Sequence, residues 1–357
     1  MTASPVQRRA NVIGLGLIGA SIALALKGAG WNVSGDDTRG PTVTTALDRG
    51  IIDESGLDVG AEITFVAVPV RSTTNEVLRA LAETTGTVTD VGSVKTPVCR
   101  SVEHPRFIGG HPMAGSEFDG IDAAQADLFH SAVWVLTPLE GSDDATFAQV
   151  NGIISSFGAD VVALSPERHD ELVAVVSHVP HLAAATLMGL ASSRSEEHAA
   201  LLRLAAGGFR DMTRVASGQP GIWIDICAEN KTAITSALGE LIAGLSNVRD
   251  LIAADDHETL RSTLQAARDA RSNLPTRVVH PEDLAEVRIP IPDRAGSAAE
   301  LFTLAGELSV NIANFEVVHV AESNRGVAVV LIDSTKSEIF RGGLIARGFR
   351  PSVQALS

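Results

Sequence analysis

The stretch Ala10–Gly19 reads ANVIGLGLIG, and it decides the fold of the N-terminal part of the chain. The apolar run Ala10–Ile13 predicts a short strand, and the apolar residues of Ile22–Leu26 predict a helix after it. The glycines between them form the pattern G-x-G-x-x-G, which allows a tight turn, a close approach of the backbone to a pyrophosphate, and close packing of helix on strand. The first amides of the helix would also bind phosphates. We therefore expect a Rossmann-type dinucleotide-binding fold, with cofactor contacts from Gly14, Gly16, Leu17, Ile18 and Gly19.

Two acidic residues follow at the distance expected of a ribose-binding carboxylate. Trp31–Gly35 predicts the second strand, and Asp36 and Asp37 come directly after it. A carboxylate in this place accepts hydrogen bonds from a ribose 2′-hydroxyl and repels a 2′-phosphate. Asp37 fits the position better than Asp36, because it completes the run V-x-G-x-D. The sequence therefore predicts NAD as the cofactor, with Arg39 near enough to soften the rejection of NADP.

Short apolar runs recur along the next part of the chain, with helix-like segments between several of them. Their alternation predicts a mostly parallel sheet covered by helices. The carboxyl ends of parallel strands face one ligand crevice, so the segments Val68-Pro69, Asp90–Ser93 and Gly110-His111, which follow expected strands, should converge there. The expected strands are Ile63–Val68, Thr87–Val91, Phe107–Ile108, Val133–Thr137 and Val161–Leu164.

The character of the sequence changes after Ser165. Strand signals end, and alanine- and leucine-rich helical patterns continue to about Leu274. The segment Leu182–Leu190 is almost continuously apolar and needs partners on several sides, which predicts a bundle core or a subunit interface. The expected helices are Glu167–Gly189, Glu196–Ala206, Trp223–Ala243 and Asn247–Ala253.

A third pattern begins at Ala285 and has the order β-α-β-β-α-β, which is typical of a ferredoxin-like module. Its expected elements are Glu286–Ile291, Ser297–Leu308, Asn311–Val320, Gly326–Ile332, Lys336–Ala346 and Arg350–Gln354. We therefore divide the chain into a Rossmann domain (1–165), an all-α substrate and dimerisation domain (166–274), a linker (275–283) and a C-terminal ferredoxin-like domain (284–357).

Composition and charge argue against several classes of protein. The 357 residues are 45% hydrophobic and 20% charged, as in ordinary soluble proteins. A net charge of -15 argues against nucleic-acid binding, which needs a basic surface. No uninterrupted apolar run of about 18 residues occurs, so we expect no membrane span. The cysteines Cys99 and Cys227 lack metal or redox spacing and Met1–Arg9 lacks an apolar signal core, which together predict a cytoplasmic protein.

The stretch Gly109–Glu117 reads GGHPMAGSE and contains the candidate for acid–base chemistry. The imidazole of His111 titrates near neutral pH, so it can take a hydroxyl proton while a nicotinamide takes a hydride. The alternative is a His-Pro turn that only exposes the ring to solvent.

Four motifs follow the dinucleotide pattern in a fixed order: DVGSVK at Asp90–Lys95, GHPMAGSE at Gly110–Glu117, SHVPH at Ser177–His181 and GFRDMTR at Gly208–Arg214. With these motifs the chain resembles the prephenate and arogenate dehydrogenases of tyrosine biosynthesis. The resemblance covers the whole length and implies that the C-terminal module is an ACT domain, a regulatory module.

The resemblance implies the oxidative decarboxylation of a cyclohexadienol with NAD. It assigns His111 as the group that accepts or polarises the hydroxyl proton, and Ser93 as a hydrogen-bond partner of that hydroxyl or of the His111 ring. Arg214 would bind the ring carboxylate, which a guanidinium can hold in a bidentate pair. Val68 and Pro69 would flank the adenosine side of the cofactor.

Further substrate contacts are implied on the helical side. Pro180 leaves open whether one helix carries both histidines of the third motif, and the alternative is a pair of helix-start histidines bonded to the backbone. A zinc pair is not expected, because no third ligand is evident. Trp223 is implied as a substrate contact, and a place in the core or in an interface is an equally good alternative for it. The residues implied as substrate contacts are His178, His181, Trp223 and Ser116.

Prephenate is the first choice of substrate, with arogenate as the alternative. Two other readings are another enzyme of the β-hydroxyacid dehydrogenase kind, which would be expected to use a lysine base, and an inactive regulator that senses NAD and an amino acid. The intact set Ser93, His111 and Arg214 argues against both. We also expect a homodimer. Tyrosine is the expected effector at the ACT module, where Pro292–Gly296 and Val310–Ile312 resemble the amino-acid-binding turn and the strand after it.

Overall fold

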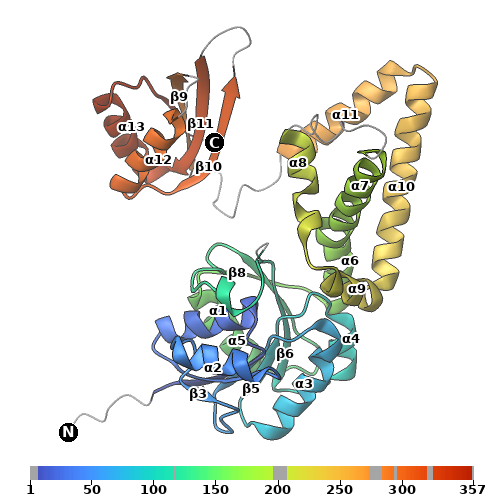
Figure 1. The fold of residues 1–357 in the computed structure, drawn as a ribbon, viewed down its shortest axis with the longest axis vertical. Helices are drawn as coiled ribbons and strands as arrows, with labels where there is room; N and C mark the ends of the chain where they lie inside the picture. The colour runs from blue at the N-terminus through green and yellow to red at the C-terminus, as the bar shows by residue number, and fades with distance from the viewer. Residues whose placement is uncertain are drawn as a thin grey trace. The chain divides into compact units, whose positions relative to one another are not determined.

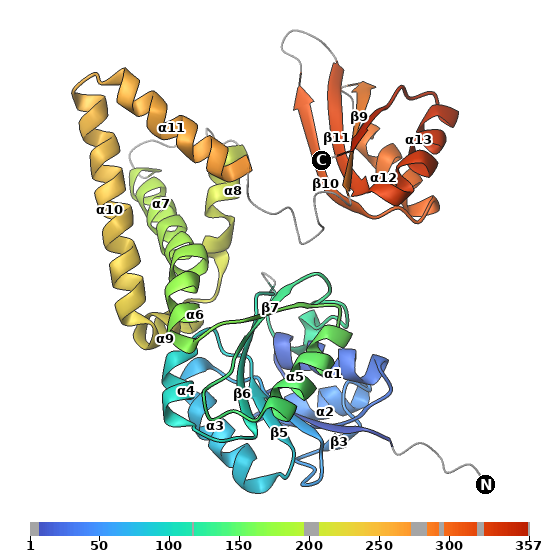
Figure 2. The same cartoon turned by 180° about the vertical axis from the view of Figure 1, so that it is seen from behind.

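The computed structural model describes residues 7–115, 118–195, 207–272, 284–292, 296–319 and 325–355. The chain divides into two compact units, Met1–His257 and Glu258–Ser357, which are coloured from blue to yellow and from orange to red in Figures 1 and 2. Four expected features lie wholly or partly outside the described residues: Ser116, the helix 196–206, the linker 275–283, and residues 293–295 of the expected amino-acid-binding turn.

An eight-stranded sheet forms the centre of the nucleotide-binding part of the first unit, with the strand order β3-β2-β1-β4-β5-β6-β7-β8. All neighbouring strands pair in parallel except β6 and β7, which are antiparallel. The predicted mostly parallel sheet is therefore confirmed. The strand β3 was not expected, because it is only two exposed residues long. The strands are β1 (Arg9–Ile13), β2 (Asn32–Asp36), β3 (Glu54–Ser55), β4 (Ile63–Val66), β5 (Thr87–Asp90), β6 (Phe107–Pro112), β7 (Val133–Thr137) and β8 (Asp160–Ala163).

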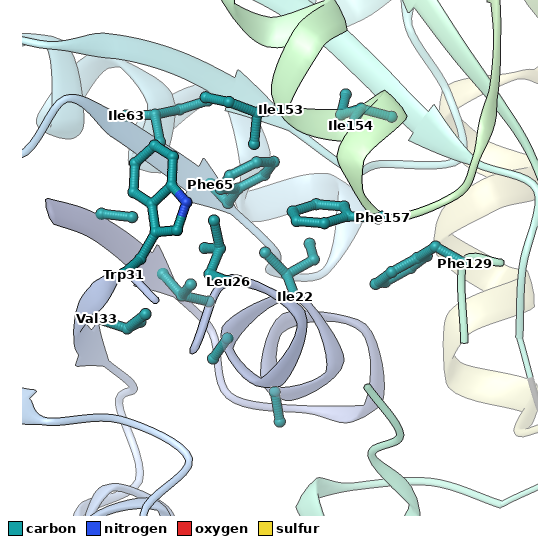
Figure 3. Close-up of a cluster of buried hydrophobic side chains, with 14 of the residues drawn as sticks. Ile22, Leu26, Trp31, Val33, Ile63, Phe65, Phe129, Ile153, Ile154 and Phe157 are labelled. Carbon is teal, nitrogen blue, oxygen red and sulfur yellow. The ribbon is translucent and has the colours of Figure 1, made fainter. Parts of the chain in front are cut away.

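Helices cover both faces of this sheet. The helices α1 (Leu17–Gly28), α2 (Gly40–Asp48) and α5 (Asp144–Ser156) pack with one face in a large apolar cluster. Figure 3 shows part of it, with Trp31, Phe65, Phe157 and Ile22 close together. The helices α3 (Val70–Glu83) and α4 (Thr96–Ser101) pack with the other face. Alternate residues of a strand enter different clusters, as Phe65 and Val66 of β4 do, which is the period-two pattern of a sheet buried on both sides.

The strand order reverses at β1, whose neighbours are β2 and β4. Open α/β sheets bind ligands at the carboxyl ends of the strands on either side of such a switch point. The loops that follow β1 and β4 contain the glycine pattern and Val68-Pro69 respectively, so the structure brings these two segments to the expected edge.

The position of His111 differs from the expectation that it follows a strand. It lies inside β6, opposite Val135 of β7. The strand begins parallel to β5 at Phe107 and Ile108 and continues antiparallel to β7 from Gly109 to Pro112. The added antiparallel partner extends the strand beyond the point at which the apolar run ends.

One long helical run begins the helical part. It consists of α6 (Pro166–Val173), a π-helical turn (Ala174–His178) and α7 (Val179–Ser195). The helix thus continues through both histidines of the third motif, which the sequence left open. The π-helical turn ends two residues before Pro180, whose missing N–H would leave a gap in an ordinary α-helical ladder.

The remaining helices of the first unit are α8 (Gly207–Thr213), a 3₁₀ turn (Arg214–Ser217), α9 (Pro220–Glu229) and α10 (Lys231–Ala253). The expected single helix over 223–243 is wrong, because the chain turns at Asn230 between α9 and α10. The expected separate helix over 247–253 is also wrong, since these residues are the end of α10.

By length and composition alone, Pro166–Ser193 could cross a membrane. The run nevertheless contains His169, Asp170 and His178, which are buried and hydrogen-bonded to side chains or backbone of the protein. These buried polar groups favour a helix that packs within the protein, because each would lose its partners in lipid.

The second unit begins at the second residue of α11 (His257–Ser272) and holds the six elements of the expected β-α-β-β-α-β order. Its antiparallel sheet has the order β10-β11-β9-β12, which is the arrangement of a ferredoxin-like fold. One face packs on α12 and α13 around Leu301, Phe340 and Leu344. The elements are β9 (Leu284–Pro292), α12 (Ser297–Glu307), β10 (Ile312–His319), β11 (Arg325–Asp333), α13 (Ser337–Ala346) and β12 (Ser352–Ala355).

Candidate active site

The glycine loop after β1 has the shape of a phosphate cradle. Gly14 has a positive φ of 90°, and a Cβ there would lie 2.2 Å from the carbonyl oxygen of Ala67. A Cβ on Gly19 would lie 1.8 Å from the carbonyl oxygen of Gly14. A Cβ on Gly16 would meet no protein atom within 4 Å. Gly14 and Gly19 therefore serve the fold of the loop, whereas the open space at Gly16 fits the approach of a ligand.

The start of α1 adds donors to this cradle. Gly16 is the N-cap, no side chain caps the helix, and the first turn has no acidic residue. The N–H of Ala20 donates to the carbonyl of Gly16. The amides of Leu17 and Ile18 come before this bond and have no carbonyl of the helix to donate to. Unpaired amides and the positive end of the helix dipole favour an anionic group.

Asp37 is tied to the glycine loop. Its carboxylate accepts hydrogen bonds from the amide of Leu15 at 2.9 Å and from the amide of Arg39 at 2.9 Å. Burial alone would raise the pKa of Asp37, but these hydrogen bonds outweigh it and lower the pKa. Asp36 instead pairs with Arg79 of α3 at 2.7 Å. Asp37 is thus the charged acceptor next to the cradle.

A buried ion pair links the loop that carries Ser93 to the strand β6 that carries His111. The side chains of Asp90 and Lys95 are fully buried and bonded to each other. The Asp90 carboxylate accepts from the amide of Gly92 at 2.8 Å and from that of Gly110 at 3.2 Å, and the Lys95 ammonium donates to the carbonyl of Gly110 at 2.7 Å. The pair thus fixes Gly92, which precedes Ser93, and Gly110, which precedes His111.

His111 belongs to a chain of hydrogen bonds that the sequence did not reveal. Its Nδ1 lies 2.8 Å from Nε2 of His169, and Nδ1 of His169 lies 2.8 Å from the Asp170 carboxylate. The same carboxylate accepts from the amides of Lys95 and Thr96, both at 2.8 Å. An ionised carboxylate only accepts hydrogen bonds, so its bond to His169 places a proton on Nδ1 of that ring.

With one proton on each ring, the order of donors follows. Nε2 of His169 is bare and accepts from Nδ1–H of His111, which leaves Nε2 of His111 as an unprotonated base. Burial, followed by the charges of His169 and Lys95, lowers the pKa of His111 well below its usual value. Burial alone would raise the pKa of Asp170, but its hydrogen bonds, chiefly that from His169, lower it.

His178 and His181 lie on the same side of their helix, against Trp223 of α9. The ring of His181 stacks on Trp223 with the centroids 3.5 Å apart and the planes at 10°, and the ring of His178 meets it edge-on at 6.2 Å. Burial lowers the pKa of His181, and its hydrogen bond to the backbone of Val215 partly offsets this. Of the two histidines, His181 has the backbone hydrogen bond that the alternative predicted. Its ring also stacks on Trp223, so two of the implied substrate contacts touch each other.

Ser93 and Arg214, the other two residues of the proposed catalytic set, differ in burial. Ser93 is half-buried, three residues beyond the end of β5. Arg214 is exposed at the start of the 3₁₀ turn that contacts α7, next to Val215 and its bond to His181. Ser116 lies outside the described residues.

Three residues of the site were missed at the level of sequence: His169, Asp170 and Asn230. His169 and Asp170 stand in the ordinary helical segment PERHDELV, and Asn230 in the middle of an expected helix. Only the adjacent pair His169-Asp170 could have served as a signal, because a carboxylate beside an imidazole often orients it.

Family models match most of the first unit. Residues 22–163 match the nucleotide-binding domain of prephenate dehydrogenase, and residues 165–266 match its dimerization domain. Prephenate dehydrogenase of Bacillus subtilis is 33% identical over 338 residues, covering 90% of this chain and 91% of the relative.

Two solved structures are similar to this chain. The prephenate dehydrogenase of A. aeolicus, in complex with hydroxyphenyl propionate and NAD⁺, superposes with a TM-score of 0.71 at 29% identity, covering 77% of this chain and 100% of that chain. The arogenate dehydrogenase of Synechocystis has a TM-score of 0.66 at 31% identity, covering 75% of this chain and 100% of that chain.

Proposed function

Because the chain belongs to the prephenate dehydrogenase family, we propose that it is an NAD-dependent prephenate dehydrogenase. It converts prephenate to 4-hydroxyphenylpyruvate by oxidative decarboxylation in tyrosine biosynthesis. The observation that carries the proposal is the chain from His111 through His169 to Asp170, which leaves an unprotonated imidazole nitrogen on a sheet that also carries a dinucleotide cradle.

The residues present fit NAD. Gly16, Leu17 and Ile18 would hold the pyrophosphate at the start of α1, and the Asp37 carboxylate would accept from the ribose hydroxyls and repel a 2′-phosphate. Val68 and Pro69 would flank the adenosine, since Val68 lies next to Gly14. When bound, NAD supplies the acceptor for the hydride.

His111 takes the proton in this mechanism. The reaction removes a hydride from the carbinol carbon and the ring carboxylate as carbon dioxide, and the ring becomes aromatic. The hydroxyl proton leaves as the hydride is transferred and returns to the phenolate oxygen of 4-hydroxyphenylpyruvate. Nε2 of His111 accepts the hydroxyl proton, while Nδ1–H donates to His169 and Asp170 offsets the charge that develops on the rings. Ser93 bonds the same hydroxyl or orients the ring. The stable aromatic product leaves positioning and proton transfer as the main tasks of the protein.

The helical part binds the rest of the substrate. Arg214, an exposed residue at the start of the 3₁₀ turn, pairs with the ring carboxylate. His178, His181 and Trp223 form the wall on the side-chain end, with Ser116 as a further contact. The intact set Ser93, His111 and Arg214 also argues against an inactive regulator.

The second candidate substrate is arogenate, which differs from prephenate in carrying an amino group in place of the side-chain keto group. Its support is the similarity to the arogenate dehydrogenase of Synechocystis. Purified full-length protein, mixed with NAD and either substrate and followed by NADH absorbance, tests both. Turnover of prephenate supports the proposal, turnover of arogenate alone favours the alternative, and turnover of neither contradicts both. Repeating the assay with NADP tests the role of Asp37.

We propose a homodimer formed through the helical part, in line with the description of the matching dimerization domain. Large apolar side chains are exposed on its helices, among them Ile224, Ile242, Leu245 and Leu190. An apolar surface of this kind marks a protein–protein interface. The free cysteines Cys99 and Cys227 support a place in the cytoplasm.

We keep the division into domains at 1–165, 166–274, 275–283 and 284–357, with the last as an ACT domain that binds tyrosine. Its support is the ferredoxin-like order of strands and the hydroxyl of Ser297, which begins α12 and is buried without a hydrogen-bond partner in the part of the chain that the structure describes. Calorimetry of the full chain with tyrosine tests it, with Ser297→Ala as the variant. Equal heats from both proteins would contradict a role for Ser297.

A further inference from the structure

Asn230 lies at the turn between α9 and α10, with φ of -109° and ψ of 31°, and its side chain is 5% exposed. Its Nδ2 donates to the backbone carbonyl of Asp170 at 2.8 Å. A carbonyl oxygen only accepts hydrogen bonds, so this contact fixes which way the amide points. The nitrogen faces Asp170, and the opposite orientation would bring two oxygens together.

The same nitrogen lies 3.3 Å from Nδ1 of His178. An amide nitrogen has two N–H donors and no acceptor. Nδ1 of His178 must therefore be the bare, accepting nitrogen, and the proton of the neutral ring is on Nε2. The orientation of one amide thus sets the tautomer of a histidine on a different helix.

His178 stays neutral in these surroundings. Its side chain is 1% exposed, and burial lowers its pKa to about 4. Of the titratable groups that face it, Asp170 raises the pKa and His169 lowers it. The ring therefore offers one N–H donor and no positive charge near neutral pH.

We infer that Asn230 is a positioning residue that holds His178 in the Nε2–H tautomer and thereby selects a substrate whose side chain presents an acceptor in place of an amino group. The inference rests on the proposed function, in which His178 contacts the substrate side chain. The keto oxygen of prephenate accepts from an Nε2–H donor. The ammonium group of arogenate has only donors, so donor would face donor, and the site prefers the keto acid.

The tautomer is tested directly by NMR of the full chain with ¹⁵N-labelled histidine. The signals of His178 are assigned by their loss in His178→Gln. The expected result for the wild type is a protonated Nε2 and a bare Nδ1. A protonated Nδ1 in the wild type overturns the inference without any variant of Asn230.

The selectivity is tested with Asn230→Asp, which keeps the size of the side chain and replaces the donor by an acceptor. Nδ1 of His178 must then carry the proton, and at mildly alkaline pH, above the raised pKa of the ring, Nε2 becomes an acceptor. The ratio of kcat/KM for prephenate over arogenate is expected to fall roughly tenfold, the size of one hydrogen bond. Asn230→Ala, which only removes the donor, should give a smaller fall.

Asn151→Asp is the matched control, because Asn151 lies on α5 and bonds only to Ser155 among the hydrogen bonds resolved for its side chain. It should leave the ratio unchanged. A merely structural role of Asn230 would lower kcat/KM for both substrates alike and leave the ratio constant, which would overturn the inference. If the wild type oxidises neither substrate, the proposed function fails, while the NMR measurement still decides the tautomer.

Discussion

Nδ1 of His111 lies 2.8 Å from Nε2 of His169, and the two residues come from different parts of the fold. His111 is on β6 of the sheet, whereas His169 is on α6, the first helix of the helical part. The proton acceptor that we propose for the reaction is thus carried by one part of the chain and oriented by the other.

Replacement of His111 by Asn should lower kcat by about 10²- to 10⁴-fold, the usual contribution of a general base. NAD binding should persist, because the glycine loop and Asp37 are untouched. Steady-state assays and titration with NAD measure the two effects. His130→Asn, at an exposed histidine, is the control. Unchanged turnover in His111→Asn would refute the role.

Asp170→Asn tests the orientation of the two rings. One oxygen of Asp170 accepts from Lys95 and His169 and the other from Thr96, so an amide must turn its NH2 group either toward the Thr96 amide or toward the Lys95 amide and His169. Either orientation loses an acceptor, and the second also reverses the preferred proton positions in both rings. We expect kcat to fall by a factor on the order of 10² or more, by analogy with the aspartate of a catalytic triad, with a much smaller change in KM. A variant that loses affinity but keeps kcat would show that Asp170 serves only the structure.

Arg214→Ala should chiefly raise KM for the substrate, by roughly 10- to 100-fold, because a hydrogen bond to a charged group contributes about 1.5–3 kcal/mol. Arg214→Lys should recover only part of the loss, since lysine lacks the bidentate fork. Initial rates over a range of substrate concentrations measure both variants. If KM barely moves in Arg214→Ala, the ring carboxylate is bound elsewhere.

Gly16→Ala should leave the fold intact and weaken NAD binding, because the added methyl meets no protein atom and occupies the space that fits a ligand. Gly28→Ala is the matched control, since its Cβ also meets nothing within 4 Å but lies at the far end of α1. Thermal unfolding and NAD titration are compared for the two proteins. Equal NAD affinity in both would place the cofactor away from this loop.

Acid should destabilise the protein through its buried histidines. Burial lowers the pKa of His178 to about 4, whereas the unfolded chain takes up this proton near pH 6.5. The unfolded state therefore binds more protons between these values, so the free energy of unfolding falls as the pH drops from about 6.5 toward 4 and is fully retained above about 6.5. The contribution of His178 is on the order of 3 kcal/mol.

Denaturant unfolding of the wild type and His178→Gln over this pH range checks the prediction. The variant should lose less stability on acidification, because it lacks the group whose pKa is lowered by burial. His130→Gln should follow the wild type. Parallel curves for wild type and His178→Gln would contradict it.

The sequence predicted the parts of the molecule that depend on local pattern. The glycine spacing predicted the dinucleotide fold, and alternation predicted the sheet and the ferredoxin-like module, because these features follow from periodicity and turn chemistry. The break at Asn230 was not predictable in this way, since the apolar pattern runs through it and the turn depends on a buried bond to Asp170. Likewise, nothing in the sequence distinguishes His169 from an ordinary helix residue, because only folding brings it to His111.

The change of strand partner within β6 has a further consequence. The backbone at His111 is paired with Val135 of β7, and the preceding Gly110 is bonded to Asp90 and Lys95, so we expect any adjustment of the base to come from the helix that carries the second imidazole. A shortened protein that ends after the sheet would keep the nucleotide-binding fold and His111. Without His169, however, nothing would fix which nitrogen of the His111 ring carries the proton. The proposed base therefore depends on the contact between the sheet and the helical part, and neither part would supply it alone.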